Sequence, residues 1–175
     1  MSERAPVRRW CARSLVRPLC AIVLVGAVLA CARLIPYAPN QNSSMPAAVA
    51  LRVVQRIVEQ QPGDHVPYHV DVTPEKLTIS SRASQIFYFD DLWQSDLHSR
   101  RGYFVVRFWD DKRHAYHVYV SDRHDAERFI DALHVLSAEA KTLAELPEPE
   151  RAQRLRTVER QRKELEVSVA ADPDS

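Results

Sequence analysis

Two alternating segments joined by a short polar turn constrain the fold more than any other feature of this chain. Residues 103–109 (YFVVRFW) and 115–120 (AYHVYV) each place large apolar side chains at every second position. An alternation with a period of two is typical of a β-strand with one buried face. The residues between the segments are too few for a parallel crossover, so the pair is predicted to form an antiparallel hairpin.

Further segments with strand character precede this hairpin at 66–72, 76–80 and 85–89, and residues 92–97 are a candidate sixth strand. Their connections are also short, which favours antiparallel pairing throughout. The apolar side chains of residues 46–60 and 122–143 recur instead at helical spacing. The predicted fold class is α+β, with an antiparallel meander sheet or a partly open barrel, an amphipathic helix before it and a capping helix after it.

The ends of the two helices carry recognisable signals. Ser44 is a candidate cap for the first helix, Pro46 suits its first turn, and Pro62-Gly63 ends it. Ser121 or Asp122 is a candidate cap for the second helix, because a short polar side chain accepts a hydrogen bond from the free amides of a first turn.

Composition divides the chain into four predicted parts. They are a signal peptide or membrane anchor at 1–30, a flexible tether at 31–45, an α+β globular domain at 46–146 and a charged tail at 147–175, partly helical or disordered. The tether is expected because two prolines, polar amides and serines leave residues 32–45 without periodicity. The tail is expected because its apolar stripe is thin and its charge is high.

The leader is the strongest indication of location. Five arginines precede an apolar run from Leu19 to Ala32, which as a helix covers about 21 Å of a hydrocarbon core roughly 30 Å thick. A basic start followed by a short apolar segment is typical of an export signal. Three fates fit the segment: lipidation, simple cleavage, or retention as an uncleaved single-span anchor in the inner membrane.

The end of the run, Val28-Leu29-Ala30-Cys31, resembles the lipobox of bacterial lipoproteins. The resemblance implies that Cys31 is acylated, with chains such as palmitate, and becomes the first residue of the mature protein. It departs from the family pattern at Leu29, where Ala or Ser is more common. The implied location is the bacterial cell envelope, attached to a membrane, with the domain on the periplasmic or extracytoplasmic side.

Composition also excludes several classes of site after the leader. All three cysteines lie at or before Cys31, which excludes disulfides, thiolate metal sites and a cysteine nucleophile downstream. Only Gly63 and Gly102 follow the leader, too few for a dinucleotide fingerprint or a P-loop. After Ala30 there are 19 Lys and Arg against 22 Asp and Glu, so nucleic acid is not an expected partner.

An aromatic strand, an acidic turn, a hairpin and a polar-capped helix follow one another in "IFYFDDLWQSDLHSRRGYFVVRFWDDKRHAYHVYVSDRHDAERFIDALHVL". This order resembles the second half of a pleckstrin-homology-like domain, over residues 66–136. The resemblance implies an open barrel closed by its C-terminal helix. The family has seven strands and no helix before the sheet. Phosphoinositide binding is not carried over, because only Lys76 and Arg82 stand in the region that family uses for it.

The candidate partner-binding face consists of Trp93, Tyr103, Arg107, Trp109 and Tyr119, which lie before the hairpin or on its strand positions opposite the expected core. Amphipathic rings and arginine are enriched in binding patches. The alternative to a partner-binding role is that the first helix or the tail covers this face. His65, His69 and His117 are a candidate zinc or copper site, and the pairs Asp90-Asp91 and Asp110-Asp111 are interpreted as turn residues.

The sequence therefore predicts a non-catalytic lipoprotein that binds a protein partner or serves as a scaffold at the envelope membrane, with no cofactor. The alternatives are an envelope metal-binding protein or hydrolase that uses surface histidines, and a single-span inner-membrane subunit of a larger complex. In each case the N-terminal lipid or helix makes the contact with the membrane.

Overall fold

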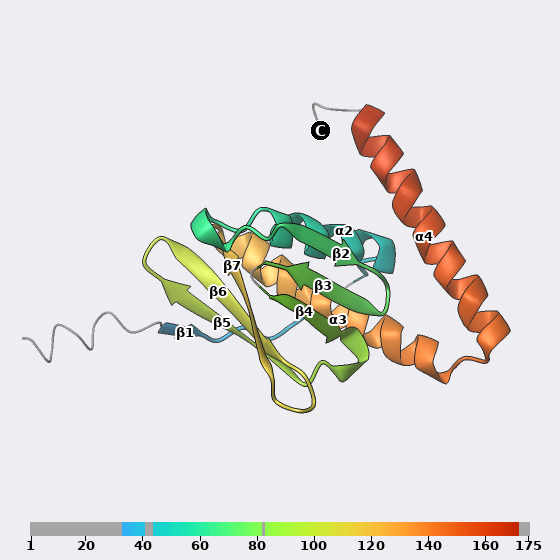
Figure 1. Ribbon diagram of the computed structural model, residues 1–175, viewed down its shortest axis with the longest axis horizontal. Coiled ribbons are helices and arrows are strands. Elements are labelled where there is room, and N and C mark those ends of the chain that lie inside the picture. The colour runs from blue at the N-terminus through green and yellow to red at the C-terminus, as the bar shows by residue number, and fades with distance from the viewer. Residues whose placement is uncertain (1–32, 41–43, 82, 172–175) are drawn as a thin grey trace, which may run out of the picture. The chain divides into compact units, whose positions relative to one another are not determined.

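The computed structural model describes residues 33–40, 44–81 and 83–171, and its elements are shown in Figure 1. Along the chain they are β1 (Arg33–Ile35), α2 (Ala47–Glu59), the 3-10 helix η1 (Gly63–His65), β2 (His69–Val72), β3 (Lys76–Ser80), β4 (Ser84–Tyr88), the 3-10 helix η2 (Phe89–Asp91), β5 (Gln94–Arg100), β6 (Tyr103–Trp109), β7 (Ala115–Val120), α3 (Arg123–Glu145) and α4 (Glu148–Ala171). The predicted α+β class is confirmed.

The strands form two antiparallel sheets instead of one meander. Sheet A has the order β1-β5-β6-β7 and sheet B the order β2-β3-β4, and the two do not close into a barrel. The break falls at η2, where Phe89 turns into the core and its amide donates to the carbonyl of Glu75. The chain thereby leaves sheet B before β5 begins. The expectation of one continuous meander sheet was wrong for this reason.

Helix α2 buries the predicted apolar stripe, because Ala50, Val53, Val54, Ile57 and Val58 all have less than a tenth of their surface exposed. The predicted cap at Ser44 is wrong. Pro46 is the N-cap, and its carbonyl accepts hydrogen bonds from the amides of Val49 and Ala50 at 3.0 Å. Proline suits this end of a helix because it contributes no amide hydrogen that would need a partner.

Helix α3 begins at the predicted cap: the Asp122 carboxylate accepts from the Asp125 amide at 3.1 Å. Its buried face contacts β5, β6, β7 and α2. Both sheets contribute to a single core, in which the rings of Phe87 and Phe108 meet edge to face with centroids 4.8 Å apart. Burial of these large rings is the main stabilising term of the fold.

The first described residues differ from the expected tether. Arg33–Ile35 pair with β5 as the edge strand β1, with Leu34 opposite His98. The Tyr37 hydroxyl donates to Asp131 of α3 at 2.8 Å, and burial together with this carboxylate raises the pKa of the tyrosine. Residues 33–40 are therefore held against the domain. Residues 41–43, also in the predicted tether, lie outside the described residues.

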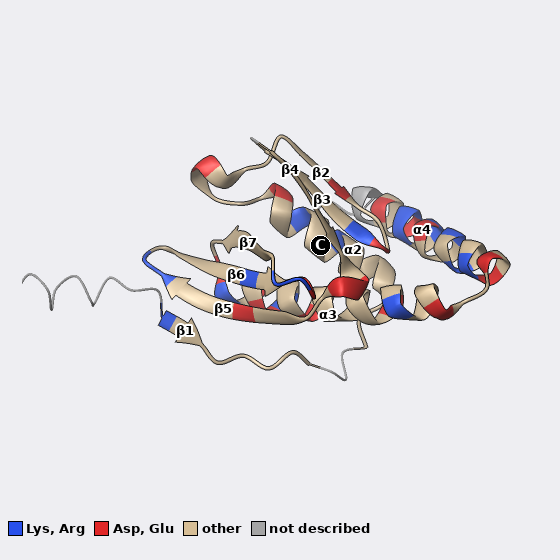
Figure 2. Cartoon of the chain, turned by 60° about the horizontal axis from the view of Figure 1, so that its bottom comes forward, with Lys and Arg blue, Asp and Glu red and all other residues tan. Residues whose placement is uncertain are grey.

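Helix α4 occupies the segment expected to be a charged tail, and it lies beside α2 (Figure 2). Val158 is buried, and arginines make most of the side-chain hydrogen bonds between this helix and the rest of the domain. Arg162 donates to the Val72 carbonyl at 2.8 Å and to Gln55, while Arg154 makes two bonds to Glu139 at 2.7 and 3.0 Å. Helix α4 is therefore held mainly by polar contacts, whereas α3 is held by the burial of its apolar side chains.

Candidate binding face

The strand register assigns the side chains of sheet A to two faces. We call the side away from α3 the outer face; it carries Leu34, Gln94, Asp96, His98, Arg100, Tyr103, Val105, Arg107, Trp109, Ala115, His117 and Tyr119. In Figure 1 no helix of the described segments lies in front of β5 and β6. Helices α2 and α4, expected as alternative covers, contact each other and other parts of the fold. No helix of the described segments packs over the centre of the outer face.

Strand β6 places Arg107 and Trp109 two residues apart, so that both side chains emerge on the outer face. The Arg107 guanidinium lies over the Trp109 ring, 4.9 Å from its centroid. A cation in this position is attracted by the negative face of the ring, which holds both side chains in one arrangement. Residues that already have their bound conformation lose less conformational entropy when a partner binds.

At the other end of the same face, Tyr103 and Tyr119 meet edge to face with centroids 5.8 Å apart. The His65 ring stacks on Tyr119 at 3.6 Å, which fixes η1 against the end of β7. Val105 lies between its cross-strand neighbours His98 and Tyr119 and is buried although it faces outward. The aromatic side chains therefore form a packed surface with a partly apolar base.

Trp93 precedes β5 and lies at the end of sheet A where the β6–β7 turn is located. Its amide donates to the Trp109 carbonyl at 3.0 Å, and 58% of its surface is exposed. Arg113 in the turn lies over the Trp93 ring at 5.5 Å. The register places four of the five predicted residues on the outer face: Tyr103, Arg107, Trp109 and Tyr119. Trp93 lies one residue before β5, at the end of the sheet next to Trp109, and the register does not assign it to this face.

The charges at the centre of the face are only partly satisfied. Arg107 Nε and His98 Nε2 are shielded from solvent and have no hydrogen-bond partner within the described residues. Burial first, and then the charge of Arg107, lower the pKa of both His98 and His117, so these rings favour their neutral form. Polar atoms without partners carry an energetic cost that an incoming acceptor would relieve.

The candidate metal site is not assembled. His65 is occupied in stacking on Tyr119, His117 lies opposite Arg107 on β6, and His69 belongs to sheet B opposite Ser80. In the described segments no three His, Cys, Asp or Glu side chains are grouped so that they could hold a metal ion. Within these segments the three histidines are therefore not brought together as one metal site.

Asp110 closes the β6–β7 turn. Its carboxylate accepts from the amide of His114 at 2.7 Å and lies 2.8 Å from the ring of the same residue. Burial raises the pKa of Asp110, but the hydrogen bonds from His114 outweigh it and the net shift is downward. The arrangement stabilises a turn in which Arg113 adopts a positive φ of 67°.

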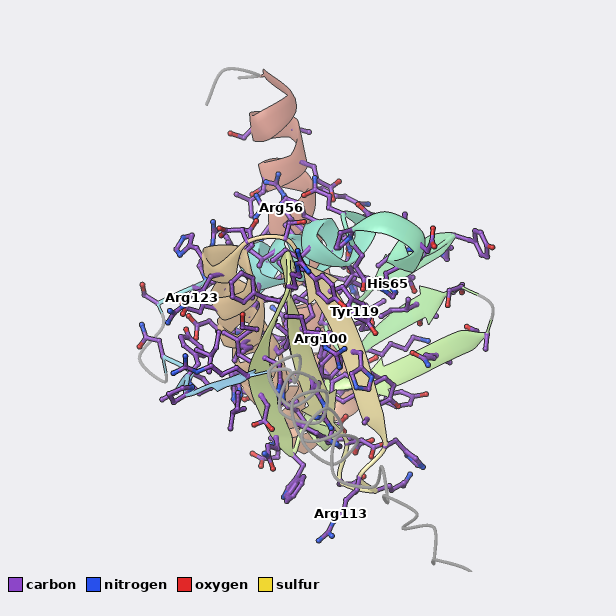
Figure 3. All side chains as sticks on the ribbon, turned by 90° about the vertical axis from the view of Figure 1, so that its left-hand side faces the viewer. Arg56, His65, Arg100, Arg113, Tyr119 and Arg123 are labelled. Atoms are coloured by element: carbon purple, nitrogen blue, oxygen red, sulfur yellow. The ribbon has the colours of Figure 1, made fainter. Side chains whose placement is uncertain are left out.

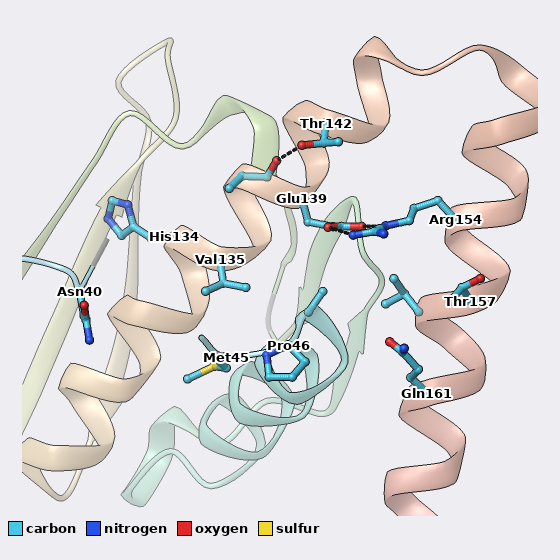
Figure 4. A pocket seen from close by; sticks show the side chains of 13 residues that line it. Asn40, Met45, Pro46, His134, Val135, Glu139, Thr142, Arg154, Thr157 and Gln161 are labelled. Atoms are coloured by element: carbon cyan, nitrogen blue, oxygen red, sulfur yellow. Dashed lines mark hydrogen bonds and ion pairs between the residues drawn. The ribbon is translucent and has the colours of Figure 1, made fainter. Parts of the chain in front are cut away.

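Sequence reasoning missed a cavity of about 620 Å³ between α3, α4 and the start of α2 (Figure 4). Met45, Pro46, Val135 and Val158 line its apolar part, and the Glu139–Arg154 ion pair lies at one side. Three elements far apart in sequence form it, so no local pattern could have indicated it.

Cys31 and the rest of the leader lie outside the described residues. Within the residues that are described, no helix is both long and apolar enough to cross a bilayer. Comparison of the chain with known protein families, curated protein sequences and solved structures gave no match.

Proposed function

We propose that this protein is a non-catalytic module of a bacterial cell envelope, attached to a membrane at its N-terminus, that binds a protein partner through the outer face of sheet A. The observation that carries the proposal is the set of aromatic and arginine side chains on a face that the described elements leave open. Such side chains dominate the binding energy of protein interfaces.

The contacts within the face support a binding role. Exposed aromatic rings that served only to cover the sheet would not need arginines stacked over them, whereas Trp109 and Trp93 each have one. The rings supply apolar area, and the guanidinium groups supply donors that can reach carboxylates or carbonyls of a partner.

The leader supports the membrane attachment, with acylation of Cys31 as the first alternative and an uncleaved single span as the second. The mass of the N-terminal peptide from the membrane fraction separates them. A peptide that begins at an acylated Cys31 is expected. A peptide that still carries the arginine-rich leader would replace the lipoprotein with the single-span anchor.

The pleckstrin-homology-like identity remains a proposal about the fold. Two three-stranded antiparallel runs followed directly by a core helix support it, while α2 and α4 are additions to the pattern. The resemblance adds nothing to the assignment of a partner, because similar folds carry many binding functions.

Photo-crosslinking from single positions tests the binding face. A benzoylphenylalanine at Trp93 is expected to give a discrete adduct with one envelope protein in intact cells, and Arg107→Ala is expected to weaken it. The matched control is the same probe at Tyr68, an exposed ring outside the outer face. Equal adducts from both positions, or none from Trp93, would contradict the proposal.

A further inference from the structure

Three arginines gather at one end of sheet A. Arg33 starts β1 and pairs with Ser99, Arg100 ends β5, and Arg101 follows in the β5–β6 turn. All three are exposed. Figure 2 shows the start of β1, the tip of β5 and the β5–β6 turn in blue at the same end, and Figure 3 looks onto it with Arg100 near the middle. We call this set the arginine end.

Among the residues that the structure describes, these arginines have no acidic partner, whereas most other arginines of the domain have one. Six arginines of the helices each form an ion pair with a carboxylate: Arg56, Arg123, Arg151, Arg154, Arg160 and Arg162. Across the described ranges, no hydrogen bond or ion pair involves the side chain of Arg33, Arg100 or Arg101. Their positive charge is not neutralised within this part of the protein.

The arginine end is also where the leader joins the domain. The apolar run ends at Ala32, directly before Arg33, and Cys31 precedes Arg33 by two residues. Two residues span at most about 7 Å even when fully extended. Because β1 is paired with β5 from its first residue, the chain has no slack there to hold the domain away from a membrane that contains an acyl chain on Cys31 or the apolar run itself.

We propose that the arginine end contacts the anionic phospholipid headgroups of the membrane that holds the N-terminus. The inference rests on the membrane attachment proposed above. The positive side chains are attracted to the negative headgroups. Each basic side chain near such a surface strengthens binding about fivefold. The same headgroups surround the point of attachment, so the contact requires no second site of insertion.

The contact would orient the outer face. Strands β5 and β6 each have seven residues; β5 ends at the arginine end and β6 begins there. At about 3.3 Å per residue they extend roughly 20 Å, which sets Trp93 and the β6–β7 turn at that distance from the headgroups. A partner would then meet the face from the side, beyond the lipid surface.

Hydrogen–deuterium exchange of the full chain in vesicles, read by mass spectrometry, tests the contact. One vesicle contains phosphatidylcholine alone, and the other contains phosphatidylcholine and phosphatidylglycerol in equal amounts. Amides of the β5–β6 turn are expected to exchange several-fold more slowly in the anionic vesicle. Those of the β6–β7 turn at the opposite end of sheet A are expected to be unchanged. The difference should disappear in 1 M salt, where the Debye length is about 3 Å.

Two variants with the same change of charge sharpen the test. Arg33→Gln leaves the β5–β6 turn intact and should lower the ratio of docked to undocked domain about fivefold. Arg160→Gln, at an exposed position of α4, should leave the exchange difference unchanged. Equal effects of both variants would indicate attraction by net charge alone and would overturn the proposal.

A preceding wash of the vesicles in alkaline buffer separates the two proposals. Protein that washes off would refute membrane attachment, and the headgroup contact with it. Protein that stays bound but exchanges equally in the two vesicles would refute the contact alone. Slow exchange of the turn in both vesicles would also overturn it, because the protection would then come from something other than anionic lipid, such as an acidic protein.

Discussion

The inner and outer faces of strands β5–β7 are built by the same segments of chain and have opposite relations to the rest of the protein. On the inner face Val106, Phe108 and Val118 are completely buried under α3. On the outer face Tyr103, Trp109 and Tyr119 are of similar or larger size and remain partly exposed. Hydrophobic bulk therefore does not by itself distinguish the core of this sheet from a surface.

The two faces differ in what accompanies the rings. Phe108 is surrounded by other apolar rings, those of Phe87, Tyr116 and Phe129. Trp109 has a guanidinium over it and Tyr119 an imidazole. A guanidinium is costly to bury without partners, which indicates that the ring of Trp109 belongs to a surface that stays in contact with water until a partner binds.

Replacement of an inner ring should have the largest effect on stability. Phe108→Ala is expected to lower the free energy of unfolding by about 3 to 5 kcal/mol, because it removes a fully buried ring and leaves a cavity. Urea denaturation followed by circular dichroism measures the change. Trp109→Ala, one residue away on the outer face, should cost at most about 1 kcal/mol. Equal losses would remove the distinction between the faces.

For partner binding, replacement of the outer ring should have a larger effect than replacement of the inner ring. Trp109→Ala is expected to weaken partner binding by about 2 kcal/mol, or roughly thirtyfold, if this ring is at the centre of the interface. The yield of the crosslink from position 93 as a function of partner concentration measures the affinity. Val167→Ala is a suitable control, since it removes an exposed apolar side chain from α4. A thirtyfold loss in the control as well would argue against a specific face.

Mild acid should destabilise the domain in part through the outer face. Burial and Arg107 lower the pKa of His98 and His117 in the folded protein, whereas the unfolded chain has the ordinary value of about 6.5. As the pH falls below 6.5 the unfolded state binds protons that the folded state does not, so stability decreases until the folded pKa values are reached.

The double variant His98→Gln, His117→Gln should therefore show a flatter dependence of melting temperature on pH between about 7 and 5 than the wild type. A slope that is unchanged in the double variant would assign the acid sensitivity to other groups.

The smallest effect is expected at the edge of the outer face. Arg113→Gln removes the guanidinium over Trp93 and should lower the free energy of unfolding by about 0.5 kcal/mol or less, since the pair is exposed. A change in the fluorescence maximum of the protein would report the loss of the contact. A decrease in the free energy of unfolding above about 2 kcal/mol would mean that Arg113 stabilises the turn itself and not only its contact with Trp93.

Local patterns were sufficient for most elements of the core. The alternation in β6 and β7, the apolar stripes of α2 and α3 and the cap at Asp122 each depend on residues within one turn or one strand of each other. Four of the five candidate face residues, Tyr103, Arg107, Trp109 and Tyr119, could be identified for the same reason, because the side of a strand on which a residue lies follows from its parity. Trp93 precedes β5 and has no such parity. Parity does not show whether another element covers that side, because this depends on distant segments of the chain.

The sequence by itself determined the α+β class, the two helices of the core and the two faces of the hairpin, because periods of 2 and 3.6 residues are local properties of the chain. Only the tertiary structure decided that the strands split into two sheets at η2, that Arg33–Ile35 join an edge more than sixty residues away, and that arginines fix α4 beside α2. These contacts are made between distant segments, and a three-residue strand or a helix held by polar bonds is too short, or too poor in apolar residues, to leave a periodic signal.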